Sequence, residues 1–121
     1  MVTEHVVTEQ DTAATVGSGD LPVLATPTLA TWFEMATVAG AADMVEDGQT
    51  TVGTLLAIEH LRPSPVGATV TIHCSMPARD GRRIMFQVRA TDADGEDLAT
   101  GKVHRAVVNA KKFMARCTTA E

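Results

Sequence analysis

Aromatic residues are scarce in this chain of 121 residues, which has three Phe, one Trp and no Tyr. Proteins that bind single-stranded nucleic acid stack bases on aromatic side chains, so this scarcity argues against such a function. The formal net charge of -5 argues in the same direction, because the phosphate backbone of DNA or RNA attracts a basic surface. No nucleic-acid partner is therefore expected, whereas a small anionic ligand needs only a few local Lys and Arg residues.

Cysteines and long apolar runs are also rare. Cys74 and Cys117 form neither a Cys-x-x-Cys motif nor a Cys/His pattern with metal-ligand spacing, and we expect reduced thiols in a cytoplasmic protein. The polar N-terminal segment MVTEHVVTEQD lacks the basic and apolar regions of a signal peptide. The longest apolar-rich stretch, residues 29–45, contains Glu34 and Asp43, so no membrane span is expected.

Several motifs of well-known protein classes are missing as well. The chain has no Gly-x-Ser-x-Gly nucleophile motif, no phosphate-binding P-loop and no Gly-x-Gly-x-x-Gly dinucleotide motif. The hydrolases and nucleotide-binding proteins that carry these motifs therefore lose support. No two histidines have the spacing typical of a metal site, and we expect neither a metal nor another cofactor.

The residues that are present suffice for one domain. Hydrophobic residues make up 45% of the chain, and a chain of this length can bury enough apolar surface to fold without a disulfide or a metal. The sequence shows no internal repeat and no linker. We predict a single domain that spans residues 1–121.

Residues 28–46 are predicted to form the one long helix. Thr28 can cap its N-terminus directly after Pro27, and Asp47 and Gly48 are typical of a helix end. Apolar and small residues occupy nearly the whole circumference of this helix, which predicts that it is mostly buried.

The rest of the chain is typical of an antiparallel sheet. Residues 1–10 can form an edge strand, and residues 11–22 are predicted to be a loop. Alternating or β-branched segments predict four further strands, at residues 50–60, 68–77, 83–91 and 97–109. Short turns force neighbouring strands to be antiparallel, so we predict an α+β fold with a sheet of about five strands. The exposed sheet edges favour a homodimer.

Two titratable residues lie in apolar surroundings. Glu34 follows Trp32 and Phe33 in the predicted helix, and burying a carboxylate is costly unless it is paired. It is either a half-exposed residue on a narrow polar stripe or a catalytic acid. His60 ends a predicted strand in the apolar phase of that strand, just before a turn. It is either a hydrogen-bonded core histidine or a functional one.

Thr26 and Gly53 are weaker candidates. The Thr26 hydroxyl precedes the predicted helix, where a plain capping or turn role is at least as common as a chemical one. Gly53 interrupts a β-branched strand, which marks a bulge, a place where a ligand meets the backbone, or simple close packing.

These residues together resemble a known family. Four segments are similar to the hot-dog-fold thioesterases, and most similar to the subgroup of fluoroacetyl-CoA thioesterases. They are TPTLATWFEMA, TVGTLLAIEHLRPSPVGATVTI, DGRRIMFQVRATD and ATGKVHRAVVNAKKF. In that family a Thr lies eight residues before a helix Glu, as Thr26 lies before Glu34. A Gly also lies seven residues before a His, as Gly53 lies before His60.

The resemblance implies a sheet wrapped around one long central helix, a homodimer, and an active site at the subunit interface. It implies hydrolysis of an acyl-CoA thioester by Thr26, Glu34 and His60, with the backbone N–H of Gly53 on the thioester carbonyl oxygen. These roles are chemically consistent. A carboxylate can attack a thioester or activate water, an imidazole moves protons near neutral pH, and an oxyanion needs a hydrogen-bond donor.

Basic residues near the C-terminus and in one turn are candidates for the phosphates of CoA. We assign Arg105 and Lys112 to substrate binding, and Arg62 and Lys111 are further candidates. For any one of these four residues, a solvated surface charge is the more common role.

One departure from the family concerns the substrate. The fluoroacetyl enzymes have an aromatic gate upstream of the catalytic Thr, whereas residues 11–25 contain no aromatic residue. We therefore expect a small or medium acyl-CoA rather than fluoroacetyl-CoA. The alternatives are a non-catalytic hot-dog module that binds acyl-CoA or another apolar ligand, and a dehydratase acting on a hydroxyacyl thioester.

Overall fold

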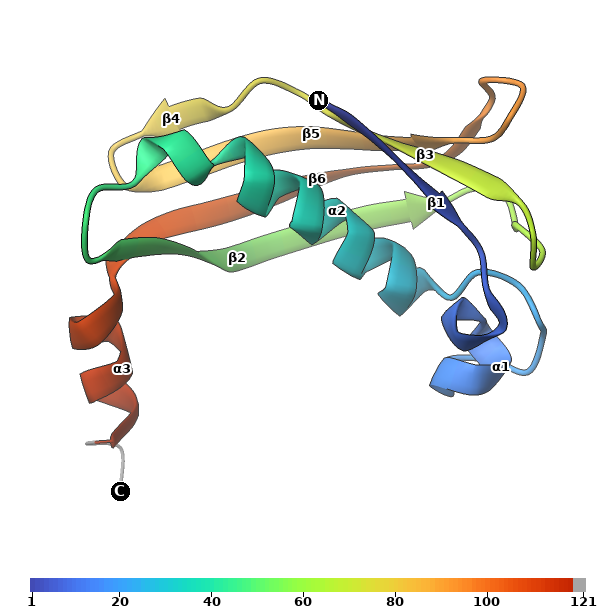
Figure 1. Cartoon of the computed structure of the whole chain (residues 1–121), viewed down its shortest axis with the longest axis horizontal. Helices are drawn as coiled ribbons and strands as arrows, with labels where there is room; N and C mark the ends of the chain where they lie inside the picture. The colour runs from blue at the N-terminus through green and yellow to red at the C-terminus, as the bar shows by residue number, and fades with distance from the viewer. Residues whose placement is uncertain (119–121) are drawn as a thin grey trace.

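The computed structural model describes residues 1–118 and is built around one curved antiparallel sheet with a helix across it (Figure 1). Five strands follow one another in the order β1-β3-β5-β6-β2, and the short sixth strand, β4, pairs with β5. The strands are β1 (Val2–Val6), β2 (Gln49–His60), β3 (Thr69–Cys74), β4 (Ala78–Asp80), β5 (Arg83–Thr91) and β6 (Asp97–Asn109). The predicted α+β class is confirmed, with β4 as an additional strand.

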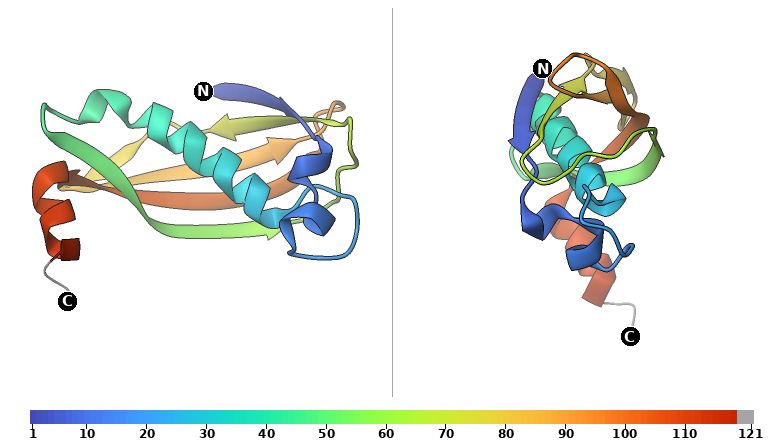
Figure 2. Two further views of the ribbon diagram at one scale, coloured as in Figure 1. Left: turned by 60° about the horizontal axis from the view of Figure 1, so that its bottom comes forward. Right: turned by 90° about the vertical axis from the view of Figure 1, so that its right-hand side faces the viewer.

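The alternation of side chains along the strands decides which face of the sheet is buried. In β5 the predicted inward residues, Ile84, Phe86, Val88 and Ala90, are all buried. The same holds for residues of the neighbouring strands that share this face: Val70, Ile72, Val103 and Val107. The core therefore lies between the concave side of the sheet and the helix, around which the sheet curls (Figure 2).

The long helix, α2 (Thr26–Gly40), begins two residues before the predicted start. Ala25 is the N-cap residue, so the prediction that Thr28 caps the helix is wrong. Pro27 lies inside the first turn, where its missing N–H would have no helical acceptor in any case. Because Ala25 is the N-cap residue, the Thr26 hydroxyl does not cap the helix.

The helix also ends earlier than predicted, at Gly40 instead of residue 46. A short 3-10 helix, η2 (Ala42–Met44), follows it. At Gly40 the helix approaches the sheet so closely that a Cβ atom would lie 2.9 Å from the Cε1 atom of Phe86. This contact fixes the C-terminal end of α2 against β5.

Only one side of α2 is buried, so the prediction that the helix is mostly buried is wrong for the single chain. The buried side consists of Leu29, Trp32, Phe33, Ala36 and Thr37. On the other side Met35 is 54% exposed and Val38 is 50% exposed. One sheet covers one face of a helix, and the apolar residues on the remaining face need another surface to cover them.

The ends of the chain hold more structure than the sequence suggested. The predicted loop at residues 11–22 contains the end of a 3-10 helix, η1 (Glu9–Asp11), and a one-turn helix, α1 (Ala13–Val16). After β6 the chain continues into α3 (Ala110–Thr118), a helix that was not among the predicted elements. Asn109 caps α3, because its Oδ1 accepts the Lys112 N–H at 2.9 Å.

β2 is an edge strand of 12 residues with an irregularity between Gly53 and Leu55. Within residues 1–118 it pairs with β6 alone, so its outer backbone groups face open space. Leu55 and Leu56 are 41% and 39% exposed. A long apolar edge of this kind is a surface for pairing with another strand. No helix among the described residues is long and apolar enough to cross a bilayer.

Candidate active site

Thr26 and His60 are brought together although 34 positions separate them in the sequence. Thr26 is the first residue of α2 and His60 is the last residue of β2. The Thr26 Oγ1 atom lies 2.8 Å from His60 Nδ1, so the hydroxyl and the imidazole share a hydrogen bond. The Thr26 hydroxyl makes no capping bond to α2, and its partner is the histidine.

The surroundings of His60 favour its neutral form. Burial lowers the pKa of His60 below its usual value, and a backbone hydrogen bond at Arg62 opposes this shift more weakly. The His60 Nε2 atom is buried and has no hydrogen-bond partner among the described residues. A neutral imidazole can accept a proton at Nδ1, and the Thr26 hydroxyl is in position to give one.

A second group gathers around Glu34. Its Oε2 atom lies 3.5 Å from the Nη1 atom of Arg105, whose side chain is only 7% exposed. The Arg105 guanidinium is held by Thr51, because Nε donates to Thr51 Oγ1 at 2.9 Å and Nη2 donates to the Thr51 carbonyl at 3.2 Å. Burial lowers the pKa of Arg105, and the nearby Glu34 carboxylate opposes this shift. Arginine keeps its charge in proteins, so Glu34 faces a fixed cation.

Gly53 lies directly against the Glu34 carboxylate. A Cβ atom at position 53 would collide with Glu34 Oε2, so only glycine fits there without displacing the acid. Gly53 pairs with Arg105 in the β2–β6 ladder and borders the irregularity in β2. Of the three sequence-based alternatives for Gly53, the bulge and the close packing apply together.

The view of Arg105 as a surface charge is wrong. Alternation in β6 places Arg105 on the same face as Val103 and Val107, which are buried. Lys102 on the opposite phase is exposed. The period of two was visible in the sequence, and it would have placed Arg105 on the inner face of the sheet. Thr51 was missed entirely, since nothing in its sequence context marks it as the anchor of an arginine.

The two groups do not meet within one chain. Gly53 and His60 are seven residues apart on β2, which corresponds to roughly 20 Å along an extended strand. Thr26 and Glu34 are eight residues apart on α2, which corresponds to about 12 Å of helix rise. No hydrogen bond or ion pair found among residues 1–118 joins the Thr26–His60 pair to the Glu34 group.

The remaining candidates belong to neither group. Lys112 is exposed on α3, which starts at the far end of β2 from His60 because the Ala110 N–H donates to the Gly48 carbonyl. Arg62 is close to His60 in the sequence, but its guanidinium pairs with Asp92 at 2.9 Å. Two further histidines serve elsewhere: His73 Nε2 lies 2.9 Å from Thr91 Oγ1, and His5 stacks on Trp32 with ring centroids 4.3 Å apart.

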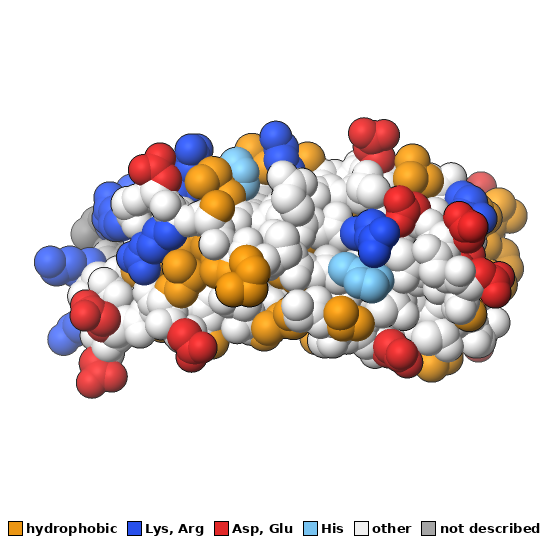
Figure 3. Space-filling model, turned by 90° about the horizontal axis from the view of Figure 1, so that it is seen from above, with side chains coloured by type: hydrophobic (Ala, Val, Ile, Leu, Met, Phe, Trp, Pro, Cys, Tyr) orange, Lys and Arg blue, Asp and Glu red, His pale blue; other side chains and the backbone are white. Residues whose placement is uncertain are grey.

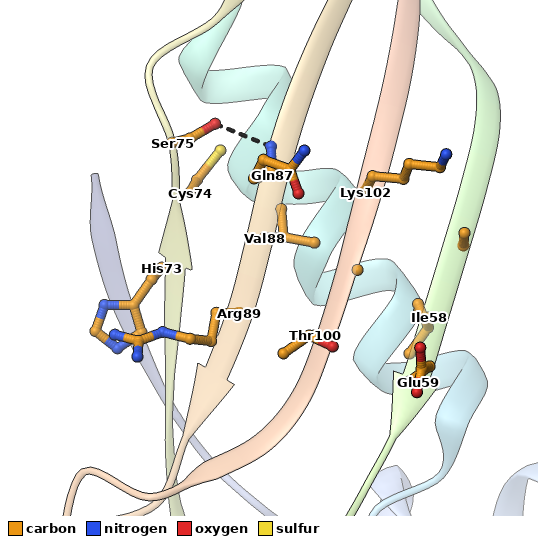
Figure 4. A pocket seen from close by; sticks show the side chains of 12 residues that line it. Ile58, Glu59, His73, Cys74, Ser75, Gln87, Val88, Arg89, Thr100 and Lys102 are labelled. Atoms are coloured by element: carbon orange, nitrogen blue, oxygen red, sulfur yellow. Dashed lines mark hydrogen bonds between the residues drawn. The ribbon is translucent and has the colours of Figure 1, made fainter.

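Of two hollows in the surface, the smaller contains the Thr26–His60 pair and the larger contains neither group of site residues. A hollow of about 310 Å³ contains Thr26 and His60 and is otherwise lined by Arg62 and by small and apolar residues, among them Ala13, Ser18 and Val23. A larger hollow of about 660 Å³ lies on the outer face of the sheet (Figure 4), between Glu59 on β2 and His73 on β3. None of the predicted site residues lines the larger hollow. Among residues 1–118, no three His, Cys, Asp or Glu side chains are grouped as metal ligands would be.

Comparison with known proteins relates this geometry to a family. The family model described as fluoroacetyl-CoA-specific thioesterase matches residues 7–111. The fluoroacetyl-CoA thioesterase of Streptantibioticus cattleyicolor is 33% identical over 94 residues, which are 78% of this chain and 67% of that protein.

Solved structures agree with the sequence comparison. A mutant of the fluoroacetyl-CoA-specific thioesterase FlK in complex with fluoroacetate and CoA is 27% identical, with a TM-score of 0.88 and coverage of 98% of this chain and 97% of that one. A hot-dog-like protein from Thermanaerovibrio acidaminovorans has a TM-score of 0.84 at 21% identity, with coverage of 98% and 87%. The predicted hot-dog fold is confirmed, with α2 as its central helix.

Proposed function

Because this chain belongs to the family of fluoroacetyl-CoA-specific thioesterases and is an acyl-CoA thioester hydrolase, we propose that Thr26, Glu34 and His60 carry out the hydrolysis. The observation that carries this proposal is the pairing of each candidate with a chemically suitable neighbour. Thr26 shares a hydrogen bond with His60, and Glu34 lies against Gly53 and Arg105. We further propose that the chain acts as a single domain.

Glu34 is the group that meets the thioester. With the carbonyl oxygen on the Gly53 N–H, the carbonyl carbon lies next to the Glu34 carboxylate. The carboxylate either attacks this carbon or takes a proton from the water that does. In both cases the C–S bond breaks and CoA leaves as a thiolate that takes up a proton. Attack by water gives the carboxylic acid directly, whereas attack by Glu34 gives a mixed anhydride that water then cleaves to the carboxylic acid and free Glu34. Arg105, 3.5 Å from the carboxylate, holds Glu34 in position for this step.

The Thr26–His60 pair supplies proton transfer. Neutral His60 accepts a proton at Nδ1 through the Thr26 hydroxyl and returns it to the leaving thiolate. The low polarity that keeps His60 neutral therefore also sets the pH range in which the enzyme works.

We propose that the active site is shared between two copies of the chain in a homodimer. A thioester carbonyl cannot contact both groups of one chain, because Gly53 and His60 are roughly 20 Å apart on β2. Antiparallel pairing between the open β2 edges of two copies brings the two groups of site residues together. A two-fold axis midway between Gly53 and His60, beside Leu56, places Gly53 of one copy opposite His60 of the other.

The apolar surface of β2 and α2 supports this interface. Leu55 and Leu56 on β2, and Met35 and Val38 on α2, are all between 39% and 54% exposed in the single chain. Burying them in a dimer removes the apolar surface that the sheet of one chain leaves uncovered. Each dimer then has two sites, each with Glu34, Gly53 and Arg105 from one copy and Thr26 and His60 from the other.

We propose that the substrate is a small or medium acyl-CoA. The hollow beside Thr26 and His60 is lined by Ala13, Ser18 and Val23 and by no aromatic residue other than the histidine. Small side chains there leave about 310 Å³ for an acyl chain or part of the carrier. We propose a cytoplasmic location, which fits the two free thiols of Cys74 and Cys117.

Mixed dimers test the shared site. A copy with His60→Ala and a copy with Glu34→Gln are each expected to form an inactive homodimer. If the two are co-expressed with different affinity tags and the mixed dimer is purified, one of its two sites is intact. We expect about half of the wild-type kcat per dimer. Inactive mixed dimers, with size-exclusion chromatography showing a dimer, would mean that each site takes all its groups from one chain.

The pH dependence of the reaction is expected to follow His60. Because its pKa lies below the usual value of about 6.5, His60 stays neutral and able to accept a proton at pH 7. The kcat/KM of the free enzyme should therefore be constant above pH 7 and fall only as the pH drops through the lowered pKa. Steady-state rates from pH 5 to 9 measure this profile, with His73→Ala as the control. An acid limb above pH 7 would contradict the assignment.

A further inference from the structure

The C-terminal helix α3 projects from the body of the molecule. It leaves the end of β6 and runs past β2, beyond the open edge of the sheet (Figures 1 and 2). Asn109 caps its first turn and the Ala110 N–H bonds to the Gly48 carbonyl, so its base is fixed. α3 is therefore an ordered arm that points to where the proposed second copy lies.

α3 is amphipathic. Its apolar stripe has helical spacing and consists of Ala110, Phe113, Met114 and Cys117. Phe113 is partly buried, whereas Met114 is 60% exposed. The other side carries Lys111, Lys112 and Arg116. The single chain thus leaves much of the apolar stripe uncovered.

Exposed apolar residues also gather at the opposite end of β2. Leu61 directly follows His60 and is 53% exposed, and it lines the hollow that contains Thr26 and His60. Leu21 beside α1 is 65% exposed, and Val66 in the turn after β2 is 50% exposed. This surface, which we call the α1-end surface, consists of Val16, Leu21, Leu61 and Val66.

The two-fold axis of the proposed dimer brings α3 and the α1-end surface together. Antiparallel pairing of β2 with its copy places the start of one strand beside the end of the other. Gln49, next to the base of α3, then lies near Leu61 of the second copy. Within residues 1–118, Met114 of the apolar stripe and all four residues of the α1-end surface remain exposed.

We propose that α3 of one copy packs its apolar stripe on the α1-end surface of the second copy. Lys111 and Lys112 then stand at the entrance to the hollow that contains His60 of that second copy, where they bind the phosphate groups of the CoA carrier. This inference rests on the proposed shared site and adds the element that recognises the carrier.

Charge supports the choice of ligand. The chain is acidic overall, and at the end from which α3 leaves, on the left of Figure 3, several Lys and Arg side chains lie among Asp and Glu side chains. Both lysines are exposed, and lysine binds phosphate as a compact point charge. Arg62 lies at the same entrance, but its guanidinium is engaged by Asp92 and by the Asp97 carbonyl. The lysines of α3 are thus better suited to the phosphates than Arg62.

Charge reversal tests the role of α3 in binding the carrier. The variant Lys111→Glu/Lys112→Glu is expected to raise the KM for butyryl-CoA about 10-fold at low salt, since two attractive charges become repulsive. The KM for butyryl-pantetheine, which lacks the nucleotide, should not change. The matched control Arg83→Glu/Lys102→Glu makes the same charge change on exposed strand residues and should leave both KM values as they are. Equal effects on both substrates, or none on butyryl-CoA, would overturn the proposal.

The mixed dimer tests the placement of α3. In a dimer of a His60→Ala copy and a Glu34→Gln copy, the intact site uses Glu34 and α3 of the first copy and His60 of the second. Charge reversal in the His60→Ala copy is expected to raise the KM about 10-fold, whereas the same change in the Glu34→Gln copy has no effect. The opposite dependence would overturn the placement while leaving the shared site standing. A mixed dimer without activity would overturn the shared site itself, and the placement with it.

Discussion

Replacing Glu34 by Gln is expected to lower kcat for acyl-CoA hydrolysis by about 10³-fold or more, because the amide can neither attack the thioester nor take a proton from water. The substitution keeps the size of the side chain, and Arg105 keeps its two hydrogen bonds to Thr51. Steady-state rates on acetyl-, butyryl-, octanoyl- and fluoroacetyl-CoA measure the effect. Wild-type turnover should not be selective for fluoroacetyl-CoA.

The matched control for this substitution is Glu59→Gln. Glu59 is exposed on the outer face of β2 and belongs to neither group of site residues, so Glu59→Gln makes the same chemical change outside the candidate site. It should leave the rates unchanged. If the wild-type protein binds acyl-CoA but turns over none of the substrates, the chain is a binding module. An enoyl product from a 3-hydroxyacyl-CoA would instead indicate a dehydratase.

Replacing Gly53 by Ala is expected to reduce kcat/KM about 100-fold, because the added methyl group takes the place of the Glu34 carboxylate and moves it away from the carbonyl. Gly53 has no positive φ, so alanine fits the backbone, and the N–H that meets the carbonyl oxygen is retained. Circular dichroism and thermal melting should show a folded protein. Thr54→Ala, at the adjacent exposed position of β2, is the control.

The double variant Gly53→Ala/Glu34→Gln tests whether the methyl group lowers the rate only by displacing the Glu34 carboxylate. If the methyl group acts through Glu34, adding it to Glu34→Gln should cost almost nothing further. Full additivity of the two losses would show that Gly53 acts independently of the acid.

Local sequence patterns predicted most of the sheet but misplaced both ends of the long helix. Strands 83–91 and 97–109 were predicted with the observed bounds, because alternation and turn residues on both sides leave little freedom. The start of α2 was missed by two residues because Pro27 was read as a residue before the helix, although proline is common in a first turn. The Asn109 cap and the apolar stripe that follows it indicate α3, but no helix was predicted there.

The candidate site was predictable as a set of residues and not as an arrangement. The spacings of Thr26, Glu34, Gly53 and His60 are one-dimensional, and they do not say that the four residues form two separate pairs. That separation follows from the lengths of α2 and β2, which only the three-dimensional structure relates to each other. The contact of Arg105 with Glu34 depends on the register of β6 against β2, which no local pattern specifies.

The separation of Thr26 and His60 from Glu34 along one chain has a genetic consequence. In a dimer with shared sites, a subunit that lacks only Glu34 disables one site when it pairs with an intact subunit, and the other site still works. A subunit that lacks both Glu34 and His60 disables both sites. When expressed with the wild-type gene, a double-defect allele would therefore lower activity more than a single-defect allele, whereas an allele lacking only Glu34 and an allele lacking only His60 would complement each other.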